Sequence, residues 1–504
     1  MQPCCRDVPH TKRGQRADGG GTYAGGVKPL VVGFDLDMTL IDTRPGIAAV
    51  WDALAAETGV VIDSIDAVSR LGPPLDEEME RWFPAHRIAE MGDRFRALYP
   101  DLAVEPTPAF AGARAAIDAV HRHGGRVLVV TGKYGPNAQL HLDHLGLDVD
   151  ELVGWLWGAE KARALLEHGA SIYVGDHLGD IDGARAANAL SVGVATGPIS
   201  ADDLRAAGAD VVLDDLDGFP AWLDEHVLQS RLADLDAQLA QLGRVTVAFS
   251  GGADSAFLLA AASRVLGPDN VLAATAVSGS LPGTELAAAR DFAEGLGVRH
   301  VTPDTHELQR AGYAANAGDR CYFCKAELLD VVRPLAERHG HIYVATGTNA
   351  DDAVAGFRPG MRAAAERGAL TPLRDAGLTK AQVRTASRRL GLPTWDKPAA
   401  ACLSSRIAYG VTITPMRLAR VERAESALRD ALAAAGIPVR DLRVRDLGES
   451  ARVEVDAGAV ARVAAAPEVL AAVGLAGFDR VEVDPRGFRS GAMNELLPDP
   501  EAFR

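Results

Sequence analysis

The sequence predicts an α/β protein with about three domains. Short apolar strands alternate with helical stretches in two separate series, and 504 residues are enough for about three domains of ordinary size. Hydrophobic residues make up 48% and charged residues 24% of the chain, which argues against wholesale disorder. No apolar run approaches the length of a membrane span, so we expect a cytoplasmic protein without a membrane partner.

The charge balance and the cysteine count limit the function classes. Asp and Glu outnumber Lys and Arg by 68 to 52, which gives a net charge of −16. Binding of nucleic-acid backbone needs clustered Lys and Arg, so we expect no nucleic-acid partner. Five Cys are too few for a disulfide scaffold, and any cysteine chemistry should therefore involve a metal or catalysis.

The first strand–helix series predicts a parallel sheet within a domain at residues 29–223. An insert at about residues 46–106 has a helical pattern and predicts a small cap. The preceding residues 1–28, with Cys4 and Cys5, lack apolar periodicity and predict a disordered tail. The expected strands are residues 30–34, 126–130, 171–174 and, more weakly, 191–194.

A predicted amphipathic helix at residues 221–242 leads into the second series, which we assign to a domain at residues 224–400. The last part, residues 401–504, predicts a small α+β domain for substrate binding or oligomerisation, and we expect a homo-oligomer. The expected strands of the second series are residues 245–249, 271–277, 300–301 and 342–346. Those of the last domain are residues 442–445, 452–455 and 481–483.

Two carboxylates, Asp35 and Asp37, follow the first strand directly. Ligands of open α/β sheets bind at the carboxyl ends of strands, so this is a favourable position for chemistry. Asp35 could act as a nucleophile, while Asp37 could protonate the leaving group and then activate water. Thr131 closes the second strand with a hydroxyl that could hold a phosphate oxygen, and Lys161 offers a positive charge.

The third strand ends in Asp176 and Asp180, whose carboxylates suit Mg²⁺. Taken together and in this order, these residues resemble the haloacid dehalogenase-like hydrolases of the phosphoglycolate-phosphatase type, over about residues 28–223. The resemblance implies a Rossmann-like domain in which Thr131 and Lys161 hold the phosphoryl group, although Ala162 replaces the usual proline after the lysine. It also implies a Mg²⁺ site made of Asp35, Asp37, Asp176 and Asp180.

A second candidate site begins where the strand at residues 245–249 runs into Ser250-Gly251-Gly252-Ala253-Asp254-Ser255 and then into a helix. Two glycines let an anion approach the backbone, and the helix start presents unpaired N–H groups to it. Asp254 could hold Mg²⁺. The string resembles the loop of the ATP pyrophosphatases, which split ATP into AMP and pyrophosphate, and it lacks the Gly-Lys-Ser/Thr of a Walker loop. We therefore expect ATP to bind here.

Three cysteines, Cys321, Cys324 and Cys402, follow this loop. A thioredoxin-like pair would need no third cysteine, and a zinc site would need a fourth ligand, for which His339 and His341 lack the spacing. Unrelated buried thiols are a further alternative. Three thiolates could instead hold a [4Fe–4S] cluster and leave one iron open for a labile sulfide.

The segments around the cysteines resemble the ATP-dependent sulfur transferases that mature the nickel-pincer cofactor of lactate racemase, over about residues 232–494. The resemblance implies that ATP adenylates a carboxylate of a pyridinium dicarboxylate mononucleotide and that sulfur then displaces AMP. Some members sacrifice the sulfur of the cysteine that matches Cys402. With Cys321 and Cys324 present, this chain resembles the cluster-bearing branch. The matching segments are residues 347–352, 372–373, 392–398, 402–406 and 443–445.

Further candidate ligands come from the same segments. The ATP-binding set gains three residues, Gly347, Asn349 and Asp351. Arginine pairs bidentately with phosphate and carboxylate groups, which makes four arginines candidates for substrate binding. These are Arg358, Arg406, Arg443 and Arg445. Glu425 and Glu454 could either bind a metal or hold the arginines.

Two rival functions remain open. A tRNA thiolation enzyme could combine the same loop with three cluster cysteines, although the net charge of −16 argues against an RNA substrate. Alternatively, the phosphatase could be the active half and the remainder a regulatory nucleotide-binding domain. A sulfur donor and a nickel-insertion protein are possible partners of the favoured function. The phosphatase substrate and the reason for the fusion do not follow from the sequence.

Overall fold

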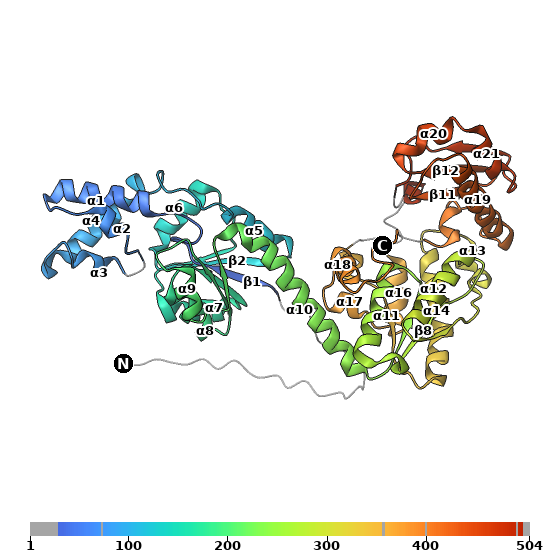
Figure 1. Ribbon diagram of the computed structural model, residues 1–504, viewed down its shortest axis with the longest axis horizontal. Helices are drawn as coiled ribbons and strands as arrows, with labels where there is room; N and C mark the ends of the chain where they lie inside the picture. The colour runs from blue at the N-terminus through green and yellow to red at the C-terminus, as the bar shows by residue number, and fades with distance from the viewer. Residues whose placement is uncertain (1–28, 72–73, 355–357, 399–400, 490–491, 497–504) are drawn as a thin grey trace, which may run out of the picture.

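The computed structural model describes residues 29–71, 74–354, 358–398, 401–489 and 492–496. The predicted disordered tail, with Cys4 and Cys5, lies outside the described residues. Figure 1 shows two bodies joined by one long helix, α10, with a smaller C-terminal unit beside the second body. The described part contains sheets of six, four and three strands, as expected of a multidomain α/β protein. The exact domain boundaries stay predictions.

The first sheet is parallel throughout, in the order β3-β2-β1-β4-β5-β6. The order reverses between β1 and β4, and ligands of such sheets bind outside the strand ends at that point. The two edge strands, β3 and β6, are short and partly exposed, and their apolar pattern was too brief for us to predict them. The bounds are β1 Val31–Phe34, β2 Arg126–Val130, β3 Glu151–Val153, β4 Ile172–Gly175, β5 Leu190–Val194 and β6 Val211–Leu213.

Helices cover both faces of this sheet, so its strands are buried on two sides. Val127 and Val129 of β2 lie in one apolar core, while Leu128 and Val130 lie in the core on the other face. The helices of this layer are α5 Ala113–Arg122, α6 Gly135–Leu145, α7 Lys161–His168, α8 Leu178–Ala186 and α9 Ala201–Ala206.

The insert after β1 forms the predicted helical cap, which has an apolar core of its own. Trp51 and Phe95 pack at its centre, with ring centroids 5.0 Å apart. Two short helices, α2 and α3, lie between its two longer ones. The cap helices are α1 Arg44–Thr58, α2 Ser64–Val68, α3 Leu75–Met79 and α4 Ile88–Leu102.

Helix α10 (Phe219–Leu242) belongs to two cores at once. Near its start, Leu223 and Val227 pack into the core of the first sheet. Near its end, Leu235 and Leu239 pack into the core of the second sheet. A single continuous helix therefore connects the two bodies, as Figure 1 shows in green.

The second sheet is also parallel, in the order β10-β7-β8-β9. Its strands are β7 Val245–Ala248, β8 Val271–Ala274, β9 Arg299–Val301 and β10 Val344–Thr346. The strand expected at residues 271–277 thus ends earlier, and Val277 makes an isolated bridge with Asp304. The helices around it are α11 Ala253–Leu266, α12 Gly283–Gly295, α13 Ala311–Ala314, α14 Arg320–Arg338, α15 Ala350–Val354, α16 Pro359–Glu366, α17 Pro372–Asp375 and α18 Lys380–Arg389.

The C-terminal unit is a three-stranded mixed sheet. Strand β11 runs antiparallel to β12, which pairs in parallel with β13. The elements are β11 Leu442–Asp446, β12 Ser450–Val455, β13 Arg480–Val483, α19 Pro415–Ala434, α20 Val460–Ala464 and α21 Pro467–Gly474. In the described chain, no single helix meets the length and apolarity needed to cross a membrane. One bent pair, Ala457–Ala464 with Pro467–Gly474, meets them only when its two helices are taken together.

We predict that two leucines of α10 stabilise different bodies. Leu223 and Leu239 are both fully buried, so replacement of either by alanine should lower the free energy of unfolding by about 2–5 kcal/mol. In calorimetry of the full chain, Leu223→Ala should lower the transition of the first body and Leu239→Ala that of the second. A common shift of all transitions by both variants would contradict independent cores.

Candidate functional site

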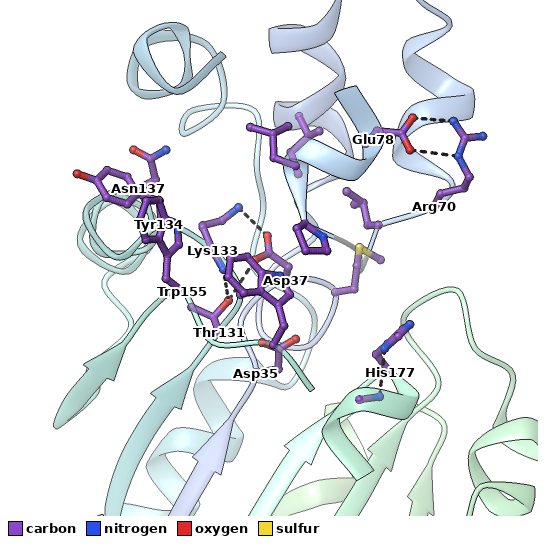
Figure 2. Close-up of a pocket in the computed structure, with 18 of the residues that line it drawn as sticks. Asp35, Asp37, Arg70, Glu78, Thr131, Lys133, Tyr134, Asn137, Trp155 and His177 are labelled. Carbon is purple, nitrogen blue, oxygen red and sulfur yellow. Dashed lines mark hydrogen bonds and ion pairs between the residues drawn. The ribbon is translucent and has the colours of Figure 1, made fainter. Parts of the chain in front are cut away.

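The carboxyl ends of β1, β2 and β4 bring the predicted phosphatase residues together. Asp35 comes directly after β1, Thr131 after β2 and Asp176 after β4. The Asp35 N–H donates to the Val174 carbonyl at 2.8 Å, which fixes the start of the loop against β4. All three side chains line a cavity of about 500 Å³ between the sheet and the cap, where Figure 2 shows Asp35 and Thr131.

Lys161 connects two of the buried carboxylates. Its Nζ lies 3.0 Å from Asp35 Oδ1 and 2.6 Å from Asp180 Oδ1, and all three residues are buried. Gly175 allows this arrangement, because a Cβ there would overlap the Asp180 side chain. Lys161 therefore reaches the site although Ala162 follows it in place of the family's proline.

Three carboxylates form a candidate metal site. Oxygen atoms of Asp35, Asp176 and Asp180 lie within 4.8 Å of one another. Burial raises the pKa of the Asp35 carboxyl to about 7 against the opposing effect of Lys161, and Asp180 raises it further. Burial and the neighbouring carboxylates of Asp180 and Asp35 hold the pKa of Asp176 well above its usual range. Clustered buried carboxylate oxygens fit a hard cation such as Mg²⁺.

Asp37, which we also predicted as a metal ligand, lies outside this group of carboxylates. Its Oδ1 is 2.7 Å from Lys133 Nζ, and its Oδ2 accepts a long hydrogen bond from Thr131 Oγ1 at 3.4 Å. Burial acts to raise the pKa of Asp37, but Lys133 outweighs burial, and the pKa lies below its usual value. These contacts keep the Asp37 side chain outside the group of carboxylates that fits a metal.

Sequence reasoning missed Lys133 and two residues behind it. Lys133 Nζ donates to Tyr99 Oη at 2.7 Å, and this hydroxyl lies 3.0 Å from His141 Nε2. Tyr99 belongs to α4 of the cap, so this chain of contacts connects the cap to Asp37. A lysine two residues after Thr131, at the end of a strand, was the available signal for Lys133. The distant Tyr99 and His141 gave no such signal.

The loop after β7 makes a tight turn into the start of α11. Gly251 adopts a φ of +73°, and Ser250 Oγ lies 3.0 Å from Ser255 Oγ. Gly347, at the end of β10, packs against the loop so closely that a Cβ would lie 2.6 Å from the Ser255 nitrogen. Asp254 Oδ1 is buried without a hydrogen-bond partner, and burial raises the pKa of this carboxyl despite Lys380. An unpartnered buried carboxylate oxygen is suited to a cation.

A second cavity, of about 350 Å³, joins this loop to two of the cysteines. Asn349 and Asp351 are absent from its lining. Asn349 instead exchanges hydrogen bonds with Asp352, and Asp351 accepts one from the backbone of Lys380 at 2.8 Å. Asp352 lines the cavity in place of Asp351. The lining residues from our predictions are Ser250, Gly252, Asp254, Ser255, Gly347, Cys324 and Cys402.

The three cysteines approach one another from two segments. Cys321 and Cys324 lie in the first turn of α14, and Cys402 precedes a turn that packs into the C-terminal core. Burial raises the pKa of Cys324, and Cys402 and Cys321 raise it further. Arg320 connects the segments by donating to the Ser404 carbonyl at 3.0 Å.

The three sulfurs do not form the compact group that a single ion would need. Among the described residues, the three Sγ atoms do not form a group within 4.8 Å of one another. A single tetrahedral Zn²⁺ with bonds of about 2.3 Å would need them closer. His341, once considered as a fourth ligand, lies beside Val245 at the amino end of β7, away from the strand ends that border the cavity.

The predicted substrate arginines are largely engaged within the chain. Arg406 and Glu425 form a buried pair at 2.9 Å, as do Arg445 and Glu454 at 2.7 Å. Of the two roles suggested for these glutamates, the contacts match that of holding arginines. The pairs also fix the cysteine turn, because Arg406 donates to the Cys402 carbonyl at 3.0 Å.

The other two arginines lie in different surroundings. The Arg443 guanidinium lies 5.1 Å from the centroid of the Phe488 ring, and burial beside Arg406 lowers the pKa of Arg443. Arg358 is exposed and lies 3.2 Å from Asp352, next to the second cavity. A substrate role for the four arginines stays a prediction.

Comparison with known proteins finds two kinds of relative. Sequence models of haloacid dehalogenase-like hydrolases and of HAD-hydrolase-like proteins match residues 32–185 and 158–219. The phosphoglycolate phosphatase of Cereibacter sphaeroides is 33% identical over 174 residues, which is 31% of this chain and 79% of that protein.

Relatives of the second kind match a longer part of the chain. The uncharacterized protein slr1717 of Synechocystis is 40% identical over 274 residues, which is 54% of this chain and 99% of that protein. The pyridinium-3,5-bisthiocarboxylic acid mononucleotide synthase of Lactiplantibacillus plantarum is 35% identical over 271 residues, which is 54% of this chain and 96% of that protein.

We predict that His141 makes the first body less stable in acid. Burial and Lys133 lower the pKa of His141 to about 4 in the folded chain, whereas an unfolded histidine titrates near pH 6.5. Between these values the unfolded state binds the additional proton, so the free energy of unfolding falls as pH falls, by about 1.4 kcal/mol per unit of pKa difference. Calorimetry from about pH 7 to pH 4 should show a weaker pH dependence for His141→Gln than for the wild type.

The control is His86→Gln, at an exposed position of the cap, which should retain the wild-type dependence. Equal dependence in the wild type and in His141→Gln would contradict the prediction.

Proposed function

Because the chain belongs to the family of pyridinium-3,5-bisthiocarboxylic acid mononucleotide synthases and carries a haloacid dehalogenase-like hydrolase part before it, we propose that it joins an ATP-dependent sulfur transferase to a Mg²⁺-dependent phosphatase. The synthase and the phosphoglycolate phosphatase named above are both enzymes. The substrates, the metal cofactors and the order of steps proposed below are our own inference for this chain.

The observation that supports sulfur transfer most directly is the second cavity. One space is lined both by Ser250 and Ser255 of the anion-binding loop and by Cys324 and Cys402. A carboxylate activated at the loop would therefore lie within the same cavity as the sulfur chemistry. The buried, unpartnered Asp254 Oδ1 is the group that would hold a cation beside the ATP phosphates.

The proposed reaction has two steps. An oxygen of the substrate carboxylate attacks the α-phosphorus of ATP, pyrophosphate leaves, and an acyl adenylate forms. A sulfur nucleophile then attacks the acyl carbon, the bond from that carbon to the AMP oxygen breaks, and a thiocarboxylate and AMP result. The N–H groups at the start of α11 would bind the charge on the phosphates, since a helix N-terminus favours anions.

The sulfur has two candidate sources. If Cys321, Cys324 and Cys402 held a [4Fe–4S] cluster, they would leave one iron without a protein ligand, where a labile sulfide could bind and serve as the nucleophile. If instead Cys402 gives up its own sulfur, the residue becomes dehydroalanine and the chain reacts once. We favour the cluster because all three thiols gather near one cavity. A sulfur donor, a nickel-insertion partner and a homo-oligomer stay predictions.

The first cavity supports phosphate-ester hydrolysis. Asp35 would attack the phosphorus while Asp37 protonates the leaving oxygen, and water would then release phosphate from Asp35 with Asp37 taking the proton. Mg²⁺ held by Asp35, Asp176 and Asp180 would supply charge compensation for the phosphate. Lys161 and Thr131 would bind the phosphoryl oxygens.

The sulfur transfer is tested with the full chain, prepared without oxygen. Incubation with ATP, Mg²⁺ and the pyridinium dicarboxylate mononucleotide should replace oxygen by sulfur in the product, as read by mass spectrometry, and should form AMP. The protein should contain about four iron atoms per chain. Cys402→Ala should lose the iron and the product. AMP formation without sulfur in any product would contradict sulfur transfer.

Cys321→Ala separates the two sulfur sources. With a cluster, this variant should lose iron and repeated turnover, because one of three thiolate ligands is gone. With a sacrificed Cys402, the same variant should still form up to one product per chain and leave dehydroalanine at position 402.

We predict that Asp35→Asn separates the two activities. Phosphate release from phosphomonoesters should fall to background, because the amide cannot act as the nucleophile, while conversion of ATP to AMP should remain. The control, Asp202→Asn, changes a carboxylate whose side chain is 95% exposed and should preserve both activities. Loss of both activities in Asp35→Asn would mean that the two sites depend on each other.

A further inference from the structure

A strained tryptophan lies in the wall of the first cavity. Trp155 follows the edge strand β3 and has a φ of +61°, a left-handed conformation that bulky side chains rarely adopt. Its side chain is nevertheless 52% exposed. The Trp155 N–H donates to the Lys133 carbonyl at 3.0 Å, which holds the turn against the loop with Thr131 and Lys133. Strain of this kind concentrates where ligands bind.

Trp155 has an aromatic neighbour on the same wall. The rings of Tyr134 and Trp155 have centroids 5.2 Å apart, and Tyr134 is 39% exposed. Figure 2 shows both residues beside Lys133 and Thr131 at the cavity. Trp157 is a third aromatic lining residue, and it packs over Gly132, where a Cβ would lie within 2.4 Å of its ring nitrogen. The cavity thus has an aromatic wall next to the residues that we propose bind the phosphate.

The size and charge of the cavity indicate a larger ligand than a two-carbon phosphate. A volume of about 500 Å³ is in the range of pockets for drug-sized molecules. Arg96 of the cap also lines it, and the ion pair of Arg96 with Asp93 is long, at 3.8 Å. A cation on the cap, an aromatic wall and a phosphate site in one cavity match a phosphate ester with a planar ring.

We propose that this cavity hydrolyses 5′-mononucleotides, with the phosphate at Asp35 and the planar base against Trp155 and Tyr134. The inference rests on the phosphatase activity proposed above and adds its substrate class. Water and the mononucleotide give the nucleoside and inorganic phosphate: the ester bond between phosphorus and oxygen breaks, and the leaving oxygen takes a proton from Asp37. Two such mononucleotides occur in the proposed sulfur transfer, the pyridinium substrate or product and the released AMP.

The test measures phosphate release by the full chain with Mg²⁺ from nicotinate mononucleotide, AMP and phosphoglycolate. We expect a higher kcat/KM for at least one mononucleotide than for phosphoglycolate. Comparison of nicotinate mononucleotide with AMP then shows whether the cavity prefers a pyridinium ring or adenine. Trp155→Asn removes the indole with a residue that accepts left-handed backbone. It should lower kcat/KM for the preferred mononucleotide about tenfold, mainly through KM, because stacking on a base is lost.

The same variant should lower kcat/KM for phosphoglycolate, which has no ring to stack, by a much smaller factor, and Trp155→Phe should restore most of the loss. Trp395→Ala, in the second body and partly exposed, is the matched control. Preference for phosphoglycolate, or an equal loss on all three substrates in Trp155→Asn, would overturn the substrate class while the phosphatase function stands. Absence of phosphate release from every substrate would overturn both, independently of the sulfur-transfer assay.

Discussion

Both sites depend on one constraint of parallel sheets, which is that all their strands end at the same edge. In the first sheet this edge collects Asp35, Thr131 and Asp176 from segments up to about 140 residues apart in the chain. In the second sheet it places the loop after β7 beside Gly347 after β10. Polar residues follow these strands in the sequence, and the parallel sheet brings them together at one edge, where they form one site.

Buried charge at the first edge requires compensation. An isolated carboxylate in such surroundings is costly, and removing one partner of a buried pair is strongly destabilising. The Lys161 ammonium forms ion pairs with both Asp35 and Asp180, while the Lys133 ammonium forms one with Asp37. The two lysines therefore separate Asp37 from the carboxylates of Asp35 and Asp180, which form a candidate metal group with Asp176. This division gives neighbouring aspartates different surroundings.

The connection between the two bodies follows from packing. Because α10 contributes Leu223 to one core and Leu239 to the other, bending it would disturb apolar contacts at either end. The two cavities belong to separate sheets, so an intermediate passing between them would have to leave one site before it entered the other. The fusion thus unites two activities in one chain while each site uses its own strand ends.

Sequence patterns alone were enough to predict the two α/β series, most strands, the helical cap, the loops at residues 175–180 and 250–255 and the three cysteines. These features are local: each is set by apolar periodicity or by a short string of residues, as in Ser250–Ser255. Short edge strands such as β3 were not predicted, because three residues show too little periodicity.

The tertiary structure decided what depends on residues distant in sequence. It paired Lys133 with Asp37 and Tyr99, placed Asp37 outside the metal group, and assigned Glu425 and Glu454 to arginines. It also placed Trp155 and Tyr134 on one wall of the first cavity, an aromatic pair that no sequence motif indicated. The physical reason is that ion pairs and ring contacts act over a few ångströms in space. Only the folded chain determines which residues lie within that distance.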